Sequence, residues 1–338
     1  MKKIKIIFLL TSILIFITAI FCIIFTARNF SSSKKEELYQ KENLIIGFSQ
    51  IGTESSWRIR NSESIIEAAQ ECNFKILFDD AKQKQSNQLK AIRSFIVYQV
   101  DVIVFVPIVS NGWENVLYEA KEAGIPVIVI DRQIDVDTSL YAGFLGENGF
   151  EEGKKAGSFL VEKCASLNQE KINILELSGT ENSSIAKERS GGFRQIIEKD
   201  KRLQIVHSED GDFLRSRGKE ILQTIINQNN GLYLNGEKID VIFSHNDPMT
   251  LGLLEAFEGY GINEYPIIIS IDAEQESIDA LTQGKLNCVV ECNPNLGPQL
   301  MKLIQDVVDG KEINRVTYME ETVFTENDDF SAYSPRGY

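Results

Sequence analysis

The chain has 338 residues, of which 43% are hydrophobic and 25% charged, so it is long enough for two globular domains of ordinary size. Its formal net charge is −14, and the first 28 residues carry four basic and no acidic side chains, which leaves the remainder still more acidic. Such a surface repels nucleic acid and anionic lipid, so the charge excludes a nucleic-acid-binding protein.

The start of the chain predicts a membrane segment. Three lysines within residues 1–5 precede an apolar stretch over 6–27, which is long enough to cross a bilayer core as a helix. Basic residues before the apolar run predict a cytoplasmic stub over 1–5 and an exported body. An uncleaved anchor and a cleaved signal peptide both fit. The absence of a good small-x-small cleavage motif near the end of the run favours the anchor.

The polar residues 28–43 are typical of a tether between a membrane and a folded body. We therefore expect an extracytoplasmic, cell-surface protein that is anchored to the outer face of the cytoplasmic membrane. It would be secreted or periplasmic if the segment over 6–27 were cleaved. Lipid attachment at Cys22 is disfavoured, because bulky Phe21 precedes it where such processing sites resemble small-residue motifs.

From residue 44 onward, short apolar runs alternate with amphipathic stretches. In the first half of this body, strands are predicted over 44–50, 74–78, 102–106, 127–131 and 141–146, and helices over 57–71, 83–98 and 112–123. In the second half, strands are predicted over 172–177, 203–208, 241–245, 267–271 and 287–291, each beside a helical pattern. This alternation predicts right-handed βαβ units in parallel sheets, and the number of strands favours two Rossmann-like lobes.

The stretch PVIVIDRQID, residues 126–135, ends a buried strand on Asp131 and Arg132. Ligands of open α/β sheets lie beyond the carboxyl ends of the strands. A carboxylate and a planar guanidinium at that edge suit a polyhydroxylated ligand, because each hydroxyl is both donor and acceptor. Taken alone, the two residues are equally consistent with a weak surface ion pair.

Other strand ends also carry charged, amide or aromatic residues. Each has a simpler interpretation by itself: Trp57 and Phe213 are plausible core residues, and Asp247 before Pro248 is typical of the start of a helix. Together they predict a cleft between two lobes, where small ligands often bind. The candidates are Glu54, Trp57, Arg58, Trp113, Asp131, Arg132, Arg189, Phe213, Asn246, Asp272, Glu291 and Asn293.

The sequence argues against an enzyme. It has two histidines, five cysteines without zinc-site spacing, no G-x-S-x-G elbow and no phosphate-binding glycine loop. Paired acids could perform glycoside chemistry, but a cleft equally rich in arginine is better suited to hold a ligand. We therefore expect no catalytic residue, cofactor or metal. A transcriptional repressor of related fold is excluded because no helix-turn-helix precedes the body.

Several long motifs resemble one family. The body from Ile45 to Tyr338 is similar to the periplasmic type I sugar-binding proteins of ABC transporters, and most closely to galactofuranose-binding members. The motifs, in chain order, are GFSQIGTESSWR, QKQSNQLKAIRSFI, VPIVSNGW, PVIVIDRQID, GDFLRSRGKE, HNDPM and the terminal GY.

The resemblance implies two lobes joined by a multi-strand hinge, with an N-terminal lobe of 44–145 plus 293–321 and a C-terminal lobe of 146–292 plus 322–338. It implies that the polar candidates bind sugar hydroxyls, that Trp57 and Phe213 pack on the sugar ring, and that Trp113 belongs to the same set of motifs. It further implies delivery of a monosaccharide to an ABC permease and its ATPase by a monomeric body. The alternative is a membrane-anchored sugar sensor that presents its closed form to a kinase or chemotaxis receptor.

Overall fold

Fully buried β-branched strands organise the described part of the chain, which comprises residues 44–330 and 335–338 in a computed structural model. The predicted stub over 1–5, the membrane segment over 6–27 and the tether over 28–43 lie outside these residues. No helix among the described residues is long and apolar enough to span a membrane. Residues 44–338 group into one compact unit that contains two six-stranded sheets and one two-stranded sheet.

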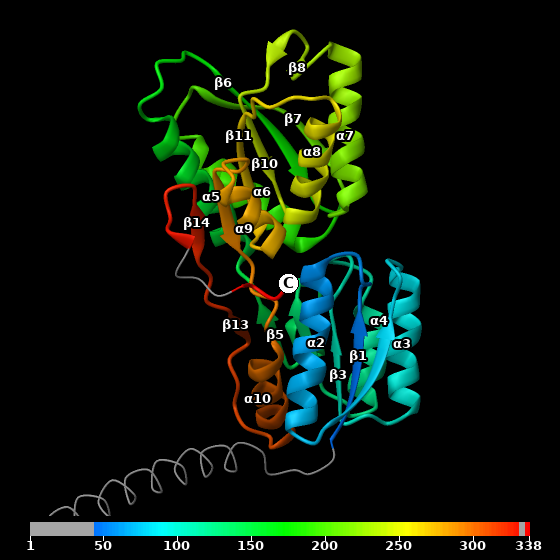
Figure 1. The fold of residues 1–338 in the computed structure, drawn as a ribbon. Helices are drawn as coiled ribbons and strands as arrows, with labels where there is room; N and C mark the ends of the chain where they lie inside the picture. The colour runs from blue at the N-terminus through cyan, green and yellow to red at the C-terminus, as the bar shows by residue number, and fades with distance from the viewer. Residues whose placement is uncertain (1–43, 331–334) are drawn as a thin grey trace, which may run out of the picture. The chain divides into compact units, whose positions relative to one another are not determined.

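The N-terminal lobe is built on a six-stranded parallel sheet (Figure 1). Parallel strands are buried on both faces, which explains continuous apolar runs such as VIVF and VIVID. Across the sheet, the strands follow the order β13 (Val316–Tyr318), β5 (Gly143–Gly146), β4 (Val127–Asp131), β3 (Val102–Phe105), β1 (Ile45–Gln50) and β2 (Lys75–Asp80). Four helices pack in two pairs, α2 (Ser56–Glu71) with α10 (Gly297–Val308) and α3 (Gln85–Val97) with α4 (Glu114–Glu122). A short 3-10 helix, η1, spans Thr138–Leu140.

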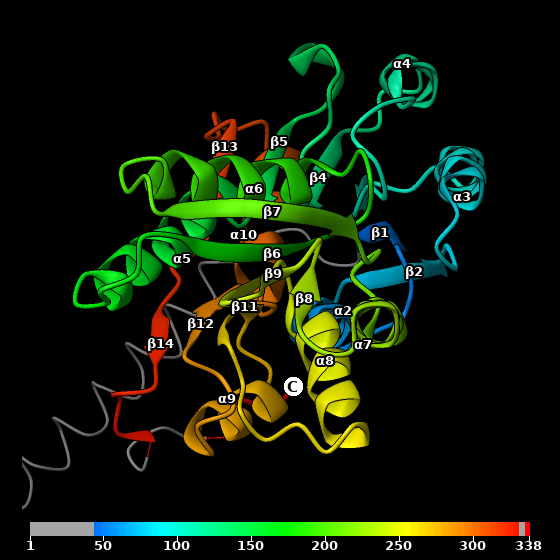
Figure 2. The same ribbon diagram turned by 90° about the horizontal axis from the view of Figure 1, so that it is seen from above.

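The C-terminal lobe repeats this plan with a second six-stranded sheet. Its order is β14 (Val323–Thr325), β12 (Cys288–Glu291), β11 (Ile267–Asp272), β10 (Val241–Ser244), β6 (Ile172–Ser178) and β7 (Leu203–Asp210). Figure 2 shows helices on both sides of the sheet. They are α5 (Gly149–Cys164) with α6 (Ser184–Ile197), and α7 (Arg215–Asn229), α8 (Asp247–Gly259) and α9 (Gln275–Thr282).

Three chain segments cross between the lobes and form the hinge. The first joins β5 to α5, the second joins β12 to α10, and the third joins β13 to β14 (Figure 1). The third segment is short, so the stretch over 316–325 supplies an edge strand to each sheet. β13 pairs parallel with β5, whereas β14 pairs antiparallel with β12.

The structure confirms the predicted α/β class with parallel sheets in two lobes. The sequence did not indicate β13, β14 or the small hairpin of β8 (Tyr233–Leu234) and β9 (Glu237–Lys238). These strands have two or three residues each, which is too short to show an alternating pattern.

Candidate functional site

Strand ends from both lobes meet at a small cavity that is lined by charged, polar and aromatic side chains. β4 ends on Asp131 and β11 ends on Asp272, which follows the rule that ligands bind at the carboxyl ends of parallel strands. The lining residues are Glu54, Ser55, Trp57, Arg58, Asp131, Arg132, Ile185, Arg189, Phe213, Asn246, Asp272 and Cys292.

Helix caps place several of these side chains. The Ser55 hydroxyl accepts a hydrogen bond from the backbone N–H of Arg58, so α2 begins with Trp57 and Arg58 in its first turn. The Asn246 side chain accepts from the backbone N–H of Met249 and donates to the carbonyl oxygen of Phe213 at 3.1 Å. The cap of α8 therefore also fixes the loop that carries Phe213.

In the N-terminal lobe, Arg58 lies between two carboxylates. Its Nη1 donates to Oδ2 of Asp131 at 2.6 Å, and its Nε lies 3.4 Å from Oε1 of Glu54. Burial opposes the charge of Arg58, but the two carboxylates outweigh it and raise the pKa of the guanidinium above its usual range. The guanidinium also lies 4.6 Å from the centre of the Trp57 ring. The other carboxylate oxygen of Glu54 is buried and has no hydrogen-bond partner among the described residues.

Arg132 is buried with few partners. Its Nη1 donates to the carbonyl oxygen of Ile108 at 3.3 Å, and its Nε has no partner in the described part of the chain. The guanidinium lies 4.8 Å from the centre of the Phe213 ring, which belongs to the other lobe. Burial, together with the nearby charge of Arg58 and against the opposing effect of Asp131, lowers the pKa of Arg132 to about 10. Arg132 therefore stays charged at neutral pH with an unused donor in the cavity.

In the C-terminal lobe, Arg189 is held on three sides. Its Nε and Nη2 donate to the two carboxylate oxygens of Glu152 at 2.7 and 3.3 Å, and its Nη1 donates to the carbonyl oxygen of His245 at 2.6 Å. Asp272 Oδ1 lies 3.9 Å from Nη2. A methyl group on Gly153 would lie 2.1 Å from the Arg189 carbonyl oxygen, so this glycine allows α5 to approach α6 and brings Glu152 to the arginine.

Three cavity residues adopt backbone conformations that L-amino acids rarely adopt. The φ angles are +64° at Asp131, +60° at Phe213 and +130° at Asp272. Such angles cost of order 1–3 kcal/mol each and persist where surrounding contacts enforce them, often at ligand sites. At Asp131 the neighbouring Gly146 leaves room, because a methyl group there would lie 2.9 Å from the Asp131 Cα atom.

Contacts between the lobes close the cavity. The Trp57 backbone N–H donates to Glu274 at 2.9 Å, and its indole Nε1 donates to the carbonyl oxygen of Cys292 at 2.6 Å. Elsewhere across the cleft, the Ser110 N–H donates to the Asn182 carbonyl at 3.0 Å. Because Trp57 belongs to α2 and its two acceptors follow β11 and β12, the backbone N–H and the indole of Trp57 together link the lobes. The cavity-lining arginines and aspartates are buried as a result.

Three of the predicted site residues lie outside the cavity. Trp113 is fully buried in the N-terminal lobe, where its indole donates to the Val109 carbonyl and packs on Phe105. Glu291 binds Arg336 and the backbone of Thr322, and Asn293 accepts from the Asn295 backbone. The sequence interpretation missed the cavity residues Ser55, Ile185 and Cys292, and Glu152 behind Arg189.

Two α/β lobes that close over a cavity lined by charged and aromatic side chains from both define a two-lobed ligand-binding protein. Residues 46–312, well over half of the chain, match the family described as the periplasmic binding protein domain. The chain belongs to this family.

Several members are similar over most of their length. The chain is 37% identical over 285 residues to the galactofuranose-binding protein YtfQ of Escherichia coli (strain K12), which covers 83% of this chain and 87% of that protein. It is 41% identical to a Mycobacterium smegmatis protein solved in complex with β-D-fucofuranose, with a TM-score of 0.78 and coverage of 84% and 91%. It is 36% identical to the periplasmic binding protein component of the arabinose ABC transporter from Shewanella sp. ANA-3, solved with α- and β-L-arabinofuranose, with a TM-score of 0.77 and coverage of 83% and 92%.

Proposed function

We propose that this protein is an extracytoplasmic solute-binding protein that holds a monosaccharide between its lobes and delivers it to an ABC permease. The sugar is a galactofuranose-like or galactose-like molecule, or a related pentose or hexose. Membership in the family supports the extracytoplasmic location, because periplasmic binding proteins act outside the cytoplasm. It needs no chemical transformation of the ligand.

One observation carries the proposal: the cavity holds an unused donor and an unused acceptor that are both buried. The Arg132 Nε and the Glu54 Oε2 lack partners among the described residues. A buried polar group without a partner costs about 1–3 kcal/mol, so this cavity favours a ligand that supplies both kinds of partner. Sugar hydroxyls do so, because each can donate and accept.

Two further features support a sugar. Trp57 and Phe213 bring one aromatic ring from each lobe to the cavity, and flat apolar surfaces suit the carbon face of a sugar ring. The three relatives described above are named for, or solved with, sugars in the five-membered furanose form. The furanose form is therefore the first choice for this chain as well.

The proposed membrane attachment rests on the sequence alone. An anchor over 6–27 and a tether over 28–43 would hold the body at the outer face of the membrane, near a permease. Fractionation of cells expressing the full chain tests this directly. Recovery of the protein in the medium without residues 6–27 would contradict an uncleaved anchor.

Calorimetric titration of residues 41–338 with a panel of sugars tests the binding function. The panel contains galactose, arabinose, ribose, glucose, fructose and a galactofuranoside. We expect dissociation constants of about 1 μM or below for one or two sugars, equivalent to about −8 kcal/mol. With galactose, an apparent stoichiometry well below one sugar per protein indicates that only a minor ring form binds.

Folded protein that has been freed of bound ligand and binds none of these sugars would contradict the proposed function. Refolding from denaturant before the titration removes carried-over sugar. A Glu54→Leu, Arg132→Met double variant provides the matched control, because it removes both unused polar groups of the cavity.

A further inference from the structure

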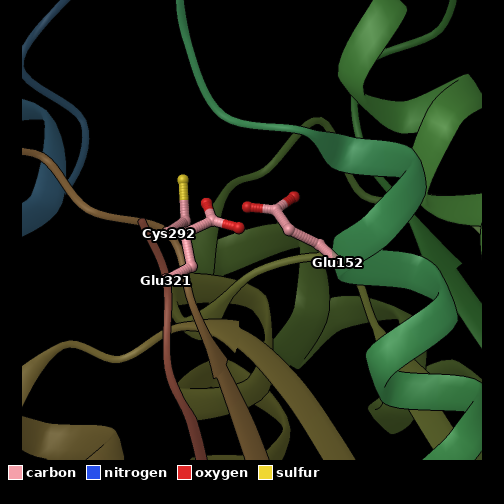
Figure 3. A group of neighbouring side chains, drawn as sticks. All are labelled: Glu152, Cys292 and Glu321. Atoms are coloured by element: carbon pink, nitrogen blue, oxygen red, sulfur yellow. The ribbon is translucent and has the colours of Figure 1, made fainter. Parts of the chain in front are cut away.

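A group of buried acidic side chains lies where the three hinge segments meet. Glu147 follows β5 in the first segment, Cys292 follows β12 in the second, and Glu321 follows β13 in the third. Glu152 joins them from α5. Figure 3 shows the carboxyl groups of Glu152 and Glu321 pointing toward each other. None of these four residues was predicted from the sequence to have a role in binding.

The two facing carboxyl groups are close and shielded from water. One carboxylate oxygen of Glu152, one of Glu321 and the Sγ atom of Cys292 lie within 4.8 Å of one another. The side chains of Glu152 and Glu321 are 0% and 3% exposed. Oε1 of Glu321 has no hydrogen-bond partner among the described residues, and its Oε2 lies 3.5 Å from Nζ of Lys155. Two ionised carboxylates in this arrangement would repel each other strongly.

The surroundings of Glu321 are mainly negative. The charged or titratable groups that face the pair come from five segments of the chain. They are Glu147 after β5, Lys155 on α5, Glu188 and Arg189 on α6, Asp272 on β11 and Cys292 after β12. Arg189 is already engaged by Glu152, and both carboxylate oxygens of Glu147 lack a partner in the described structure. Burial and the carboxylates of Glu152 and Glu147 raise the pKa of Glu321 well above its usual range.

We propose that Glu321 is a neutral carboxylic acid in the folded protein and donates a hydrogen bond to Glu152, which in turn positions Arg189 in the cavity. Glu321 is thus a positioning residue that ties the third hinge segment to a ligand-binding arginine. The ligand-binding part rests on the proposed function. A divalent cation between the carboxylates is the competing arrangement.

The geometry explains why a shared proton fits. Each carboxylate oxygen of Glu152 accepts one hydrogen bond from Arg189 and retains a second lone pair. A donor from Glu321 can use such a lone pair without displacing the guanidinium. An ionised Glu321 would instead push against Glu152 and compete for Arg189, disturbing the position of the arginine from outside the cavity.

The first experiment measures unfolding of residues 41–338 by urea at pH 6 to 9, for the wild type and Glu321→Gln. The amide of glutamine donates to Glu152 as the protonated acid does, but it does not titrate. Glu321 has a raised pKa in the folded state. Well below about pH 4.3 the folded and the unfolded protein both hold its proton, so the stability does not depend on it. As pH rises from there toward the folded pKa, only the folded protein keeps the proton, so the free energy of unfolding falls.

We expect the unfolding constant of the wild type, relative to that of Glu321→Gln, to rise about tenfold per pH unit in this range. A ratio that stays flat with pH would overturn the neutral acid. So would stabilisation of the wild type by calcium or zinc chloride, reversed by EDTA and missing in Glu321→Gln, because it would place a cation there instead.

The second experiment measures sugar affinity by calorimetry at pH 7.5 with Glu321→Gln and Glu321→Leu. We expect glutamine to retain the wild-type affinity within twofold and leucine, which has similar size but no donor, to weaken it at least fivefold. Equal affinities would overturn the positioning role. If the wild type binds no sugar, the proposed function fails, while the pH dependence of unfolding still decides the state of Glu321.

Discussion

Both lobes place buried arginines in the cavity, and two of these, Arg189 and Arg132, are held very differently. Arg189 in the C-terminal lobe donates to both oxygens of Glu152 and to the His245 carbonyl. Arg132 in the N-terminal lobe donates to one backbone carbonyl and leaves its Nε without a partner in the described structure. The surroundings raise the pKa of Arg189 and lower that of Arg132 to about 10.

This contrast separates two roles of a buried charge. A guanidinium that the fold already satisfies contributes to the cavity as a fixed wall and is needed for stability. A guanidinium that the fold leaves incompletely paired lowers stability until a ligand arrives, and it then gives binding energy. The same substitution should therefore destabilise the unliganded protein at Arg189 but not at Arg132.

The largest effect is expected for Arg189→Met. The variant leaves Glu152 buried without its partner, and breaking one side of a buried ion pair typically costs about 3–5 kcal/mol. Urea unfolding of residues 41–338 without sugar measures the loss. Glu152→Gln combined with Arg189→Met removes both charges and should recover part of it. A loss of unfolding free energy below about 1 kcal/mol would show that the ion pair contributes little to the stability of the C-terminal side of the cavity.

Arg132→Met should leave the unliganded protein as stable as the wild type, or more stable by about 1 kcal/mol, because it removes a poorly paired buried charge. Sugar affinity should fall at least tenfold, since charge-assisted hydrogen bonds contribute about 1.5–3 kcal/mol each. Calorimetry and urea unfolding check the two parts. Arg132→Lys is the matched control, and wild-type affinity in that variant would argue against a planar fork that binds two hydroxyls.

Asp131→Asn tests the acceptor side of the N-terminal wall. Asparagine tolerates the positive φ at this position, so the backbone is preserved, whereas alanine would also add backbone strain. We expect about a tenfold loss of sugar affinity, because the variant removes the charge of Asp131 and weakens its hydrogen bond with Arg58. Circular dichroism confirms folding. Unchanged affinity would remove Asp131 from the binding site.

The effect expected for Glu188 in α6 depends on pH and nearly vanishes in acid, because the C-terminal lobe carries surplus carboxylates. Burial and the nearby Glu152 carboxylate raise the pKa of Glu188 to about 7. A raised carboxyl pKa costs stability as pH rises from the unfolded value near 4.3 to the folded value. Glu188→Gln should therefore stabilise the protein by about 1–2 kcal/mol at pH 8 and by almost nothing at pH 4.5. Equal effects at both pH values in urea unfolding would contradict this.

Local sequence rules predicted the fold class and located much of the cavity. Asp131 and Arg132 follow an apolar run that is typical of a buried strand. Because parallel strands present their carboxyl ends at one edge of the sheet, this position alone predicts that both residues lie at the cavity. Trp113 shows the limit of such logic, since a large aromatic residue after a strand is equally suited to the core, and there it packs on Phe105.

The supporting residues were beyond local rules. Nothing in the sequence distinguishes Glu152 from the adjacent Glu151. Only the close packing of α5 on α6 at Gly153 places Glu152 against Arg189. Glu321 lies more than 160 residues from Glu152 along the chain, as its contact with Lys155 also shows. Contacts of this kind depend on how the hinge segments pack against α5, and a pattern over a few residues does not predict that packing.

The stretch over 316–325 covers one edge of each six-stranded sheet and is among the last parts of the chain to be synthesised. It supplies β13 at one edge of the first sheet and β14 at one edge of the second. Without it, β5 and β12 become open edges, and both are buried strands with the mainly apolar sequences GFLG and CVVE. Open apolar edges are templates for aggregation. A chain that terminates prematurely or is clipped by a protease just before residue 316 thus loses protection on both lobes together, although almost all of it has been made.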